Sequence, residues 1–451
     1  MKKVIGFLLI LIMIFSVTAF PVHAEKGPGL PAVFRVHYES EEKTAKNGNA
    51  FIYKEYLITC SDKLNALLKN TADLFESTYT PSMTDKCSKP RRNNRMDIHT
   101  VWSRTGTRWL SALVLCRWAK NRVQMFSPFY AVTWDLEKDR RVSLTDIFAS
   151  DSEAWQILSA GVRTQLASCY PLIKADEQRL CSISSIENLA LTPFTLHAEE
   201  LTLHFSASDL YGGQSGLLNV RFYYTDLRPY MTQEALEQTD NSAYPKVALS
   251  FDDGPAYNET AGILNNLRKF GARGTFFVVG SRIGEFKDIL HRTYDENNLV
   301  ESHTNGHNDA SKQTSAEIVR TVQRSQKAIS DVIGPEATMM RPPYGTAAPY
   351  TRSKVGLPVV MWNLDTKDWT GKTPSAVLST VKSKVKNGDL ILMHDIKTNT
   401  VESSVKVCEY LYEQGYMMVS VEELMRCGGV IMQSDQVYYR CQDGLINDDS
   451  Y

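Results

Sequence analysis

The sequence predicts an α/β protein of two parts, a strand-rich α+β half followed by a half in which strands and helices alternate. Its 451 residues exceed what one hydrophobic core usually serves. Alternation of apolar and other residues with a period of two recurs through residues 32–230, and β-α units follow residue 244. Repeated β-α units are typical of a parallel sheet or barrel with its site at the carboxyl ends of the strands.

The composition excludes disorder for most of the chain and makes nucleic acid an unexpected partner. Hydrophobic residues make up 43%, charged residues 22% and aromatic residues 10%, which are ordinary globular values. Fifty Lys plus Arg stand against 51 Asp plus Glu, a formal charge of −1. This balance leaves no basic excess to hold a phosphate backbone by counterion release.

The first residues have the pattern of a secretory signal. Lys2 and Lys3 precede an apolar run at residues 4–17, and residues 22–24 offer small side chains to a signal peptidase. We therefore expect a signal peptide at residues 1–24 and an exported protein that is secreted, periplasmic or associated with the envelope. An uncleaved membrane anchor is the alternative, because the apolar run approaches the shortest length that spans a bilayer.

The cysteines fit an exported protein whose thiols can pair. Both halves hold an odd number, so either each half has a free cysteine or one bridge crosses between the halves. Cys169 with Cys181, and Cys427 with Cys441, are close enough in sequence to close short loops, but the connectivity stays open. The eight cysteines are Cys60, Cys87, Cys116, Cys169, Cys181, Cys408, Cys427 and Cys441.

The first half is expected to consist of strands around one clear helix. That helix covers residues 151–167, where apolar residues recur at spacings of three and four, so one face should lie on a sheet. A polar stretch at residues 232–243 marks the boundary with the second half. The expected strands lie at residues 33–38, 129–136, 201–205 and 217–224.

The helices of the second half carry their own start signals. Thr314 and Glu317 form a capping box, and Thr373 stands as a cap before Pro374. No GxGxxG or P-loop motif suggests a nucleotide-binding fold. The expected strands lie at residues 247–251, 274–279, 338–341, 359–363, 390–394 and 417–421.

Ionisable residues stand where these strands end. Asp252 and Asp253 close the first strand. Because adjacent side chains on an extended segment point to opposite sides, one carboxylate can bind a metal while its neighbour meets the metal's water. A turn rich in aspartate, before Gly254 and Pro255, is the alternative interpretation.

Two histidines add the spacing of a metal site. On a helical turn, His303 and His307 would share one face and could chelate one divalent ion. Together with Asp253 they would form a set of two histidines and one carboxylate that leaves coordination positions open, as catalytic sites for zinc or other divalent metals require. Surface histidines are the alternative.

Three further strand ends carry Arg341, the pair Asp368 and Trp369, and His394. Each alone fits a structural role, but their order along the chain favours a site. In that order, the five segments resemble the motifs of polysaccharide deacetylases of carbohydrate esterase family 4, the NodB-homology domain. The resemblance covers about residues 244–425. It implies a distorted, incomplete (β/α) barrel of the NodB-homology type, preceded by a smaller α+β domain. The segments are residues 250–255, 303–307, 341–344, 365–369 and 392–394.

The resemblance implies catalytic roles for four residues. Asp252 would be the catalytic base and His394 the general acid. Arg341 would orient the base, and Asp368 would interact with this arginine and tune His394. A base that stays charged and an acid that keeps its proton predict a bell-shaped pH profile.

The resemblance also implies a metal centre and a substrate site. The metal is usually zinc, with cobalt, manganese or nickel as alternatives. The amide of Tyr344 would sit at the oxyanion, and Trp369 and Leu392 would wall the acetyl group. The metal ligands would be Asp253, His303 and His307.

Short phrases of the first half resemble an accessory domain found ahead of some peptidoglycan deacetylases and in the lysozyme-sensing anti-sigma factor family. They lie at residues 141–148, 191–194 and 216–227. This resemblance implies an envelope location and glycan binding. Isolated histidines of this half are expected to be surface or half-buried. Its tryptophans are expected to pack in the core, with stacking on sugars as the alternative. These residues are His99, His197, His204, Trp102, Trp109, Trp118 and Trp134.

The sequence thus predicts a metal-dependent hydrolase that removes acetyl groups from N-acetylated sugars (GlcNAc or MurNAc) of peptidoglycan glycan strands. Chitin-type or other envelope polysaccharides, or acetyl xylan, are alternative substrates. A non-catalytic protein that binds or senses glycan is the alternative class. The sequence shows neither which of the two sugars is the substrate nor the oligomeric state of the protein. The expected divisions are a signal peptide at 1–24, an accessory domain at 25–235, a linker at 236–245, a catalytic domain at 246–426 and a tail at 427–451.

Overall fold

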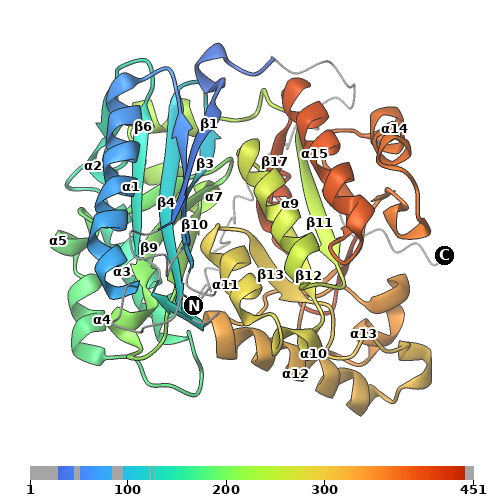
Figure 1. The fold of residues 1–451 in the computed structure, drawn as a ribbon. Helices are drawn as coiled ribbons and strands as arrows, with labels where there is room; N and C mark the ends of the chain where they lie inside the picture. Colours follow the sequence, from blue (N-terminus) through green and yellow to red (C-terminus); the bar gives the residue numbers. More distant parts are fainter. Residues whose placement is uncertain (1–28, 45–50, 84–94, 121–122, 127, 442–451) are drawn as a thin grey trace, which may run out of the picture.

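The computed structural model shows the two halves of the chain side by side, with residues of the first half on one side and those of the second half on the other (Figure 1). The signal segment expected at residues 1–24 and Cys87 lie outside the described residues. The structure describes residues 29–44, 51–83, 95–120, 123–126 and 128–441.

A mostly antiparallel sheet of order β1-β2-β3-β4-β6-β7, with β5 paired to β4, forms the outer part of the first half. Its centre is the long hairpin of β3 (Arg95–Thr105) and β4 (Trp109–Lys120), which pair along their whole length. Helix α1 (Asp62–Met83) packs on this sheet through an apolar face. The remaining strands are β1 (His37–Thr44), β2 (Phe51–Ile58), β5 (Val123–Phe126), β6 (Phe129–Asp135) and β7 (Arg140–Val142).

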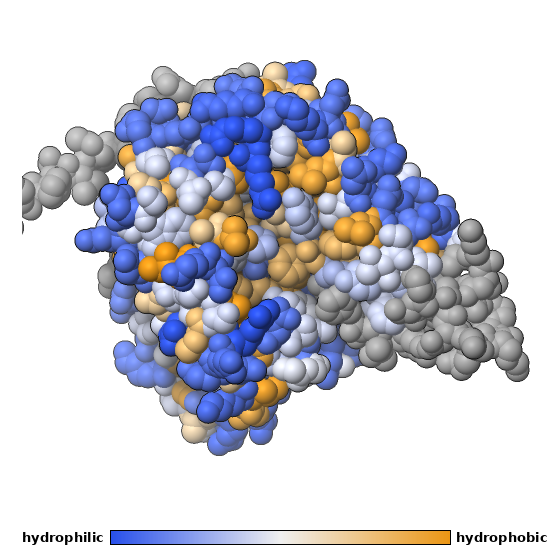
Figure 2. Space-filling model, turned by 90° about the vertical axis from the view of Figure 1, so that its left-hand side faces the viewer, coloured by the Kyte–Doolittle hydropathy of each residue, from blue (hydrophilic) through white to orange (hydrophobic). Residues whose placement is uncertain are grey.

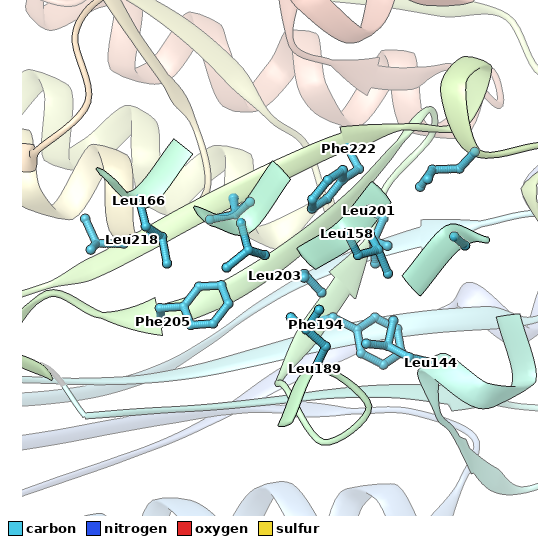
Figure 3. Close-up of a cluster of buried hydrophobic side chains, with 14 of the residues drawn as sticks. Leu144, Leu158, Leu166, Leu189, Phe194, Leu201, Leu203, Phe205, Leu218 and Phe222 are labelled. Carbon is cyan, nitrogen blue, oxygen red and sulfur yellow. The ribbon is translucent and has the colours of Figure 1, made fainter. Parts of the chain in front are cut away.

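A second, three-stranded antiparallel sheet carries the helix that the sequence predicts. This helix, α3 (Ala154–Ala167), buries Leu158 and Leu166 against the sheet side chains shown in Figure 3. The sheet consists of β8 (Phe194–Leu196), β9 (Glu200–Ser206) and β10 (Leu217–Tyr223). The shorter helices are α2 (Leu144–Ile147), α4 (Glu177–Ile183), α5 (Ile186–Leu189), α6 (Ala207–Leu210), α7 (Tyr224–Leu227) and α8 (Gln233–Thr239).

Three expectations for the first half are wrong. Helix α1 was not expected; it is long, but its buried Leu64 and Leu68 stand among polar and aromatic residues that weaken the periodic signal. The expected strand at 33–38 begins instead as a 3-10 turn at Ala32–Phe34, after Pro31, and β1 follows. The histidines are buried rather than at the surface, because each contacts a polar partner inside. The exposed fractions are 3% for His99, 5% for His197 and 1% for His204.

The second half is built on parallel strands in the order β13-β12-β11-β16-β15, with β17 beside the start of β11. Bridges of Met340 to Ser302 and Val359 link this sheet to the pair β14–β18, so the strands curve into a distorted, open barrel. The strands are β11 (Lys246–Asp252), β12 (Gly274–Val278), β13 (Leu299–Ser302), β14 (Val359–Val360), β15 (Leu364–Asp365), β16 (Asp389–His394), β17 (Met417–Val419) and β18 (Val437–Tyr438).

Helices cover the outside of this sheet (Figure 1). Both predicted start signals are confirmed: Thr314 and Glu317 form the capping box of α12, and Thr373 accepts a hydrogen bond from Ala376 at the start of α14. The helices are α9 (Tyr257–Lys269), α10 (Gly280–Ile283), α11 (Lys287–Asp295), α12 (Ser315–Ile333), α13 (Ala348–Arg352), α14 (Pro374–Lys384), α15 (Thr398–Glu413) and α16 (Val421–Cys427).

Several strands of the second half differ from the prediction. The expected strand at 359–363 is shortened to β14, and the short strands β15 and β18 were not expected. The expected strand at 338–341 is reduced to the two bridges of Met340. Strand β13 was not expected, because its four residues include Glu301 and Ser302 and so show no apolar run. It becomes a strand because Glu301 is buried and accepts hydrogen bonds from the backbone N–H groups of Thr338 and Met339.

Buried polar contacts join the two halves. His197 of the first half lies 2.6 Å from the amide nitrogen of Asn297, and Arg273 pairs with Glu200 at 3.1 Å. Hydrogen bonds inside a desolvated contact favour one relative placement of the halves, because breaking them would leave buried groups unsatisfied.

Asp295 at this contact predicts a pH-dependent stability. Burial raises the pKa of Asp295 to about 6, although the N–H of Leu217 donates to its carboxyl. The stabilisation from its protonated form is present below the unfolded pKa and is lost as the pH rises through about 6. Asp295→Asn should therefore raise the free energy of unfolding at pH 7.5 by about 1–3 kcal/mol and leave it nearly unchanged at pH 4.

Denaturant unfolding at the two pH values measures this difference. Asp209→Asn, at an exposed position of α6, is the matched control and should show no such pH dependence. A destabilisation of Asp295→Asn at pH 7.5 would contradict the assignment.

The seven cysteines of the described segments are all free thiols, so neither Cys169 with Cys181 nor Cys427 with Cys441 forms a bridge. Within the same segments, no helix has the length and hydrophobicity to cross a bilayer. The outer face of the first half is mostly hydrophilic, with hydrophobic groups gathered in a hollow across its middle (Figure 2).

Candidate active site

The predicted site residues converge at the carboxyl ends of the parallel strands. Asp252 ends β11 and His394 ends the neighbouring β16, and the two are register partners. His303 follows β13, and Asp368 lies in the turn after β15. Because parallel strands all end at one edge of the sheet, residues far apart in the chain come together there.

Asp253, His303 and His307 form a compact donor set. Asp253 Oδ1 lies 3.3 Å from His303 Nε2 and 3.1 Å from His307 Nε2, and the three ligand atoms lie within 4.8 Å of one another. His303 Nδ1 is 2.8 Å from the carbonyl oxygen of Arg341. A carbonyl only accepts, so Nδ1 carries the proton and Nε2 presents its lone pair to the site.

These three residues fit a divalent metal ion. Apart from the imidazole nitrogens of His303 and His307, the buried Asp253 Oδ1 has no polar partner within the described chain. Two imidazole nitrogens and one carboxylate oxygen are ligands that zinc accepts, and three protein ligands leave room for water or substrate. The arrangement can therefore hold an ion with open coordination positions.

The backbone around these ligands differs from the expected helical turn. Residues 303–307 form a loop, in which Thr304 and His307 have φ of 62° and 51°. Asp253 has φ of 78°, which turns its side chain out of the strand direction. Positive φ is unfavourable for residues other than glycine and persists where the surroundings impose it, often at functional sites. The loop, rather than helical spacing, brings the two imidazoles together.

Asp252 is held by a buried arginine. Arg341 is fully buried, and its Nη1 donates to Asp252 Oδ1 and to Ser250 Oγ, both at 2.8 Å. Its other donors bind the carbonyl oxygens of Val360 and Met361. Asp252 Oδ2 lies 4.0 Å from His303 Nε2, so this oxygen is on the metal side.

His394 is held by Asp368. His394 Nδ1 lies 2.9 Å from Asp368 Oδ1, and the backbone N–H of His394 donates to Asp368 Oδ2 at 2.8 Å. Thr400 Oγ1 donates to the same Oδ2 at 2.6 Å. The imidazole can therefore turn only its Nε2 toward a substrate.

The expected contact between Arg341 and Asp368 is wrong. Within the described chain, the polar contacts of Arg341 are with Asp252, Ser250 and two carbonyl groups, and those of Asp368 are with His394, threonines and backbone amides. The reason is that the guanidinium already donates to Asp252, to Ser250 and to two carbonyl groups. The base and the acid are thus supported by two separate networks.

The charges of the site are strongly coupled. Burial alone would raise the pKa of Asp253, but the close imidazoles of His303 and His307 hold it well below the usual range. Burial alone would lower the pKa of His394, but its hydrogen bond to Asp368 and that residue's charge raise it above the usual value. The field of the site therefore favours a protonated His394.

The predicted substrate residues surround this centre. The ring of Tyr344, whose backbone φ is 59°, lies edge-on to the His307 ring at 4.7 Å and is 69% exposed. Trp369 is 53% exposed, whereas Leu392 is buried on β16. An exposed tyrosine and an exposed tryptophan beside a polar centre are suited to contact with a sugar ring.

Sequence reasoning did not identify two residues that support the site. Ser250 donates to the carbonyl of Ile391 and accepts from Arg341, and Thr400 on α15 binds Asp368. Ser250 stands inside the first motif and could have been found there. Thr400 has no local signal, because its role depends on how α15 packs against the loop after β15.

Known proteins similar to this chain include several deacetylases. Residues 239–358 match the family model of polysaccharide deacetylase. A peptidoglycan-N-acetylglucosamine deacetylase of Listeria monocytogenes is 35% identical over 179 residues, which are 40% of this chain and 38% of that protein. A peptidoglycan-N-acetylglucosamine deacetylase of Bacillus cereus is 34% identical over 197 residues, 41% of this chain and 72% of that protein.

A third relative reaches into the first half. The peptidoglycan-N-acetylmuramic acid deacetylase of Bacillus subtilis is 26% identical over 314 residues, 64% of this chain and 67% of that protein. A solved structure of a peptidoglycan deacetylase from that organism is 31% identical and covers 41% of this chain and 91% of the solved chain, with a TM-score of 0.40. This chain spans little more than a third of the length of the Listeria relative. The match to the family model and the extensive match to the Bacillus cereus relative show that this chain belongs to the polysaccharide deacetylase family.

Proposed function

We propose that this chain is an exported enzyme that removes acetyl groups by hydrolysis from N-acetylated sugars of cell-wall peptidoglycan. The observation that carries the proposal is the cluster of Asp253, His303 and His307, beside a carboxylate and a histidine with separate supports. The glycan is inferred from the names of the relatives, which are peptidoglycan deacetylases.

In this proposal Asp253, His303 and His307 hold a divalent ion, with zinc as the first choice. A bound ion of this kind polarises the acetyl carbonyl and lowers the pKa of a water molecule. Asp252 accepts the proton of the attacking water through Oδ2, since Arg341 occupies Oδ1. The backbone N–H of Tyr344 would donate to the oxyanion that develops on the substrate.

His394 completes the reaction by giving a proton to the departing amine. Because Nδ1 is bonded to Asp368, the proton leaves from Nε2. The neighbouring carboxylate keeps the imidazole protonated before the transfer. Acetate and the free amine of the sugar are the products, and the exposed Trp369 and the buried Leu392 would contact the acetyl group and the ring around it.

The first half would act as an accessory domain. We assign it to residues 25–235, joined through 236–245 to a catalytic domain at 246–426. Its described strands form two sheets apart from the barrel. An envelope location fits this reading, since the substrate would be the wall itself.

Acetate release tests the proposal directly. The purified chain should release acetate from peptidoglycan faster than from chitooligosaccharides or acetylated xylan at equal acetyl concentration. Mass spectrometry of the digested wall would show whether GlcNAc or MurNAc has lost its acetyl group. Release from none of the three substrates would reject the proposal.

The pairing of His394 with Asp368 predicts the alkaline side of the pH profile. The active form of His394 is protonated, and its raised pKa keeps that form present above the ordinary range for histidine, until it is lost as the pH rises further. Asp368→Asn removes the charge that raises this pKa, so the alkaline limb of kcat/KM should move to lower pH.

Thr400→Val is the matched control for this shift. It removes only a neutral hydrogen bond to Asp368 and should displace the limb much less. An unchanged alkaline limb in Asp368→Asn would show that another group controls it.

A further inference from the structure

A small cavity lies between the two halves, at the amino ends of the barrel strands and away from the candidate active site. Its volume is about 30 Å³. The first half contributes Trp102 and Arg104, which share one face of β3, and the second half contributes Arg273, Tyr412 and Glu423. Arg273 directly precedes β12, and Met417, which starts β17, also lines the cavity.

Arg104 is a buried cation without an anionic partner. Arg104 is 7% exposed, and neither its Nη1 nor its Nη2 makes a hydrogen bond within the described chain. The guanidinium lies 4.5 Å from the ring centre of Tyr244 and 5.5 Å from that of Phe34. The ring faces and the nearby Tyr244 hydroxyl favour the guanidinium charge, but neither supplies a carboxylate to balance it. A buried charge without a partner is costly, so an acceptor is expected beside it.

Other groups around the cavity also donate and find no acceptor. Trp102 Nε1 and Arg273 Nη2 are buried and make no hydrogen bond to any described residue. Indole and guanidinium nitrogens only donate. The one carboxylate that lines the cavity, Glu423, already accepts hydrogen bonds from Arg273 Nη1 at 2.9 Å, from Ser420 and from the N–H of Glu199. Arg273 is balanced by Glu423 and also by Glu200 of the first half, whereas Arg104 has no carboxylate partner within the described chain.

We propose that this cavity binds a small inorganic anion, a halide such as chloride, with Arg104 as its main partner. The volume is enough for about one or two groups of the size of water, which excludes a sugar or a nucleotide. An anion accepts from several donors at once and also balances the buried charge, whereas a water molecule supplies only the acceptor. Because both halves line the cavity, a bound halide would stabilise their contact.

Thermal unfolding of the full chain tests the site. Sodium chloride replaces sodium gluconate at constant ionic strength, so that general screening stays the same. We expect a saturable rise of Tm by about 2 °C or more in chloride, since a ligand that binds only the folded chain stabilises it. Arg104→Met, which keeps the length and the ring contacts but removes the charge, should show no rise. Arg320→Met, at an exposed position of α12, should respond as the parent does.

A second measurement covers the case in which Arg104→Met does not fold. Crystals of the parent chain soaked in sodium bromide should show an anomalous peak in the cavity beside Arg104. Equal Tm in chloride and gluconate for the parent, the same chloride response in Arg104→Met, or an ordered water without anomalous signal would each overturn the proposal.

Discussion

Replacing Asp252 by asparagine is expected to lower kcat by about 10²–10⁴-fold while the bound metal stays at the parent level. Asparagine keeps the size of the side chain and can still accept the hydrogen bond that Arg341 donates at 2.8 Å. It cannot take a proton from water. Asp253, His303 and His307 are unchanged, so metal content measured by atomic emission should not differ.

The comparison requires a control that loses a carboxylate elsewhere. Asp331→Asn, at an exposed position of α12, removes the same charge far from the barrel mouth and should keep the parent rate. Melting temperatures of both variants would exclude unfolding as the cause of a loss. Full activity of Asp252→Asn would remove this residue from the role of base.

Replacing His307 by alanine is expected to abolish tight metal binding and to lower kcat/KM by about 10³-fold. Asp253 and His303 alone would leave two ligands, fewer than catalytic zinc sites use. His307 is partly exposed in a loop, so its removal creates little buried space, and the fold should survive. Metal stoichiometry after dialysis and acetate release with added zinc measure the two effects.

Chelation of the parent chain should reproduce this loss, and added zinc should restore the parent activity but not that of His307→Ala. His37→Ala, at an exposed position at the start of β1, is the matched control and should bind metal normally. A parent chain that stays active after its metal has been removed would contradict a metal-dependent reaction.

Motif residues were predictable because the chemistry needs particular groups at strand ends. Asp252, Asp253, His303, His307, Arg341 and His394 could each be named from spacing and resemblance, and the family membership that they predicted is confirmed. Their contacts were less predictable. The resemblance implied that Asp368 contacts Arg341 and tunes His394. The structure shows the pairing with His394, adds Thr400, and does not show the contact with Arg341.

Elements with weak local patterns also could not be predicted from the sequence. Helix α1 buries Leu64 and Leu68 on the outer sheet, but its polar and aromatic residues hide the period. Strand β13 has Glu301 in its middle, and only burial of this side chain against the backbone of Thr338 and Met339 makes the strand possible. Such elements form because residues far away in the chain bury their apolar side chains or bind their polar groups.

By itself, the sequence determined which chemical groups the site contains. The donors and acceptors are those of two aspartates, two spaced histidines, an arginine and a further histidine, which follow apolar strands. Tertiary structure alone decided how they act together. Asp253, His303 and His307 converge within 4.8 Å, Arg341 holds Asp252, and Arg104 lies between the halves without a carboxylate partner in the described chain. Residue type sets what a group can do, but distance and desolvation set the strength of its interactions, and both arise only when remote segments pack.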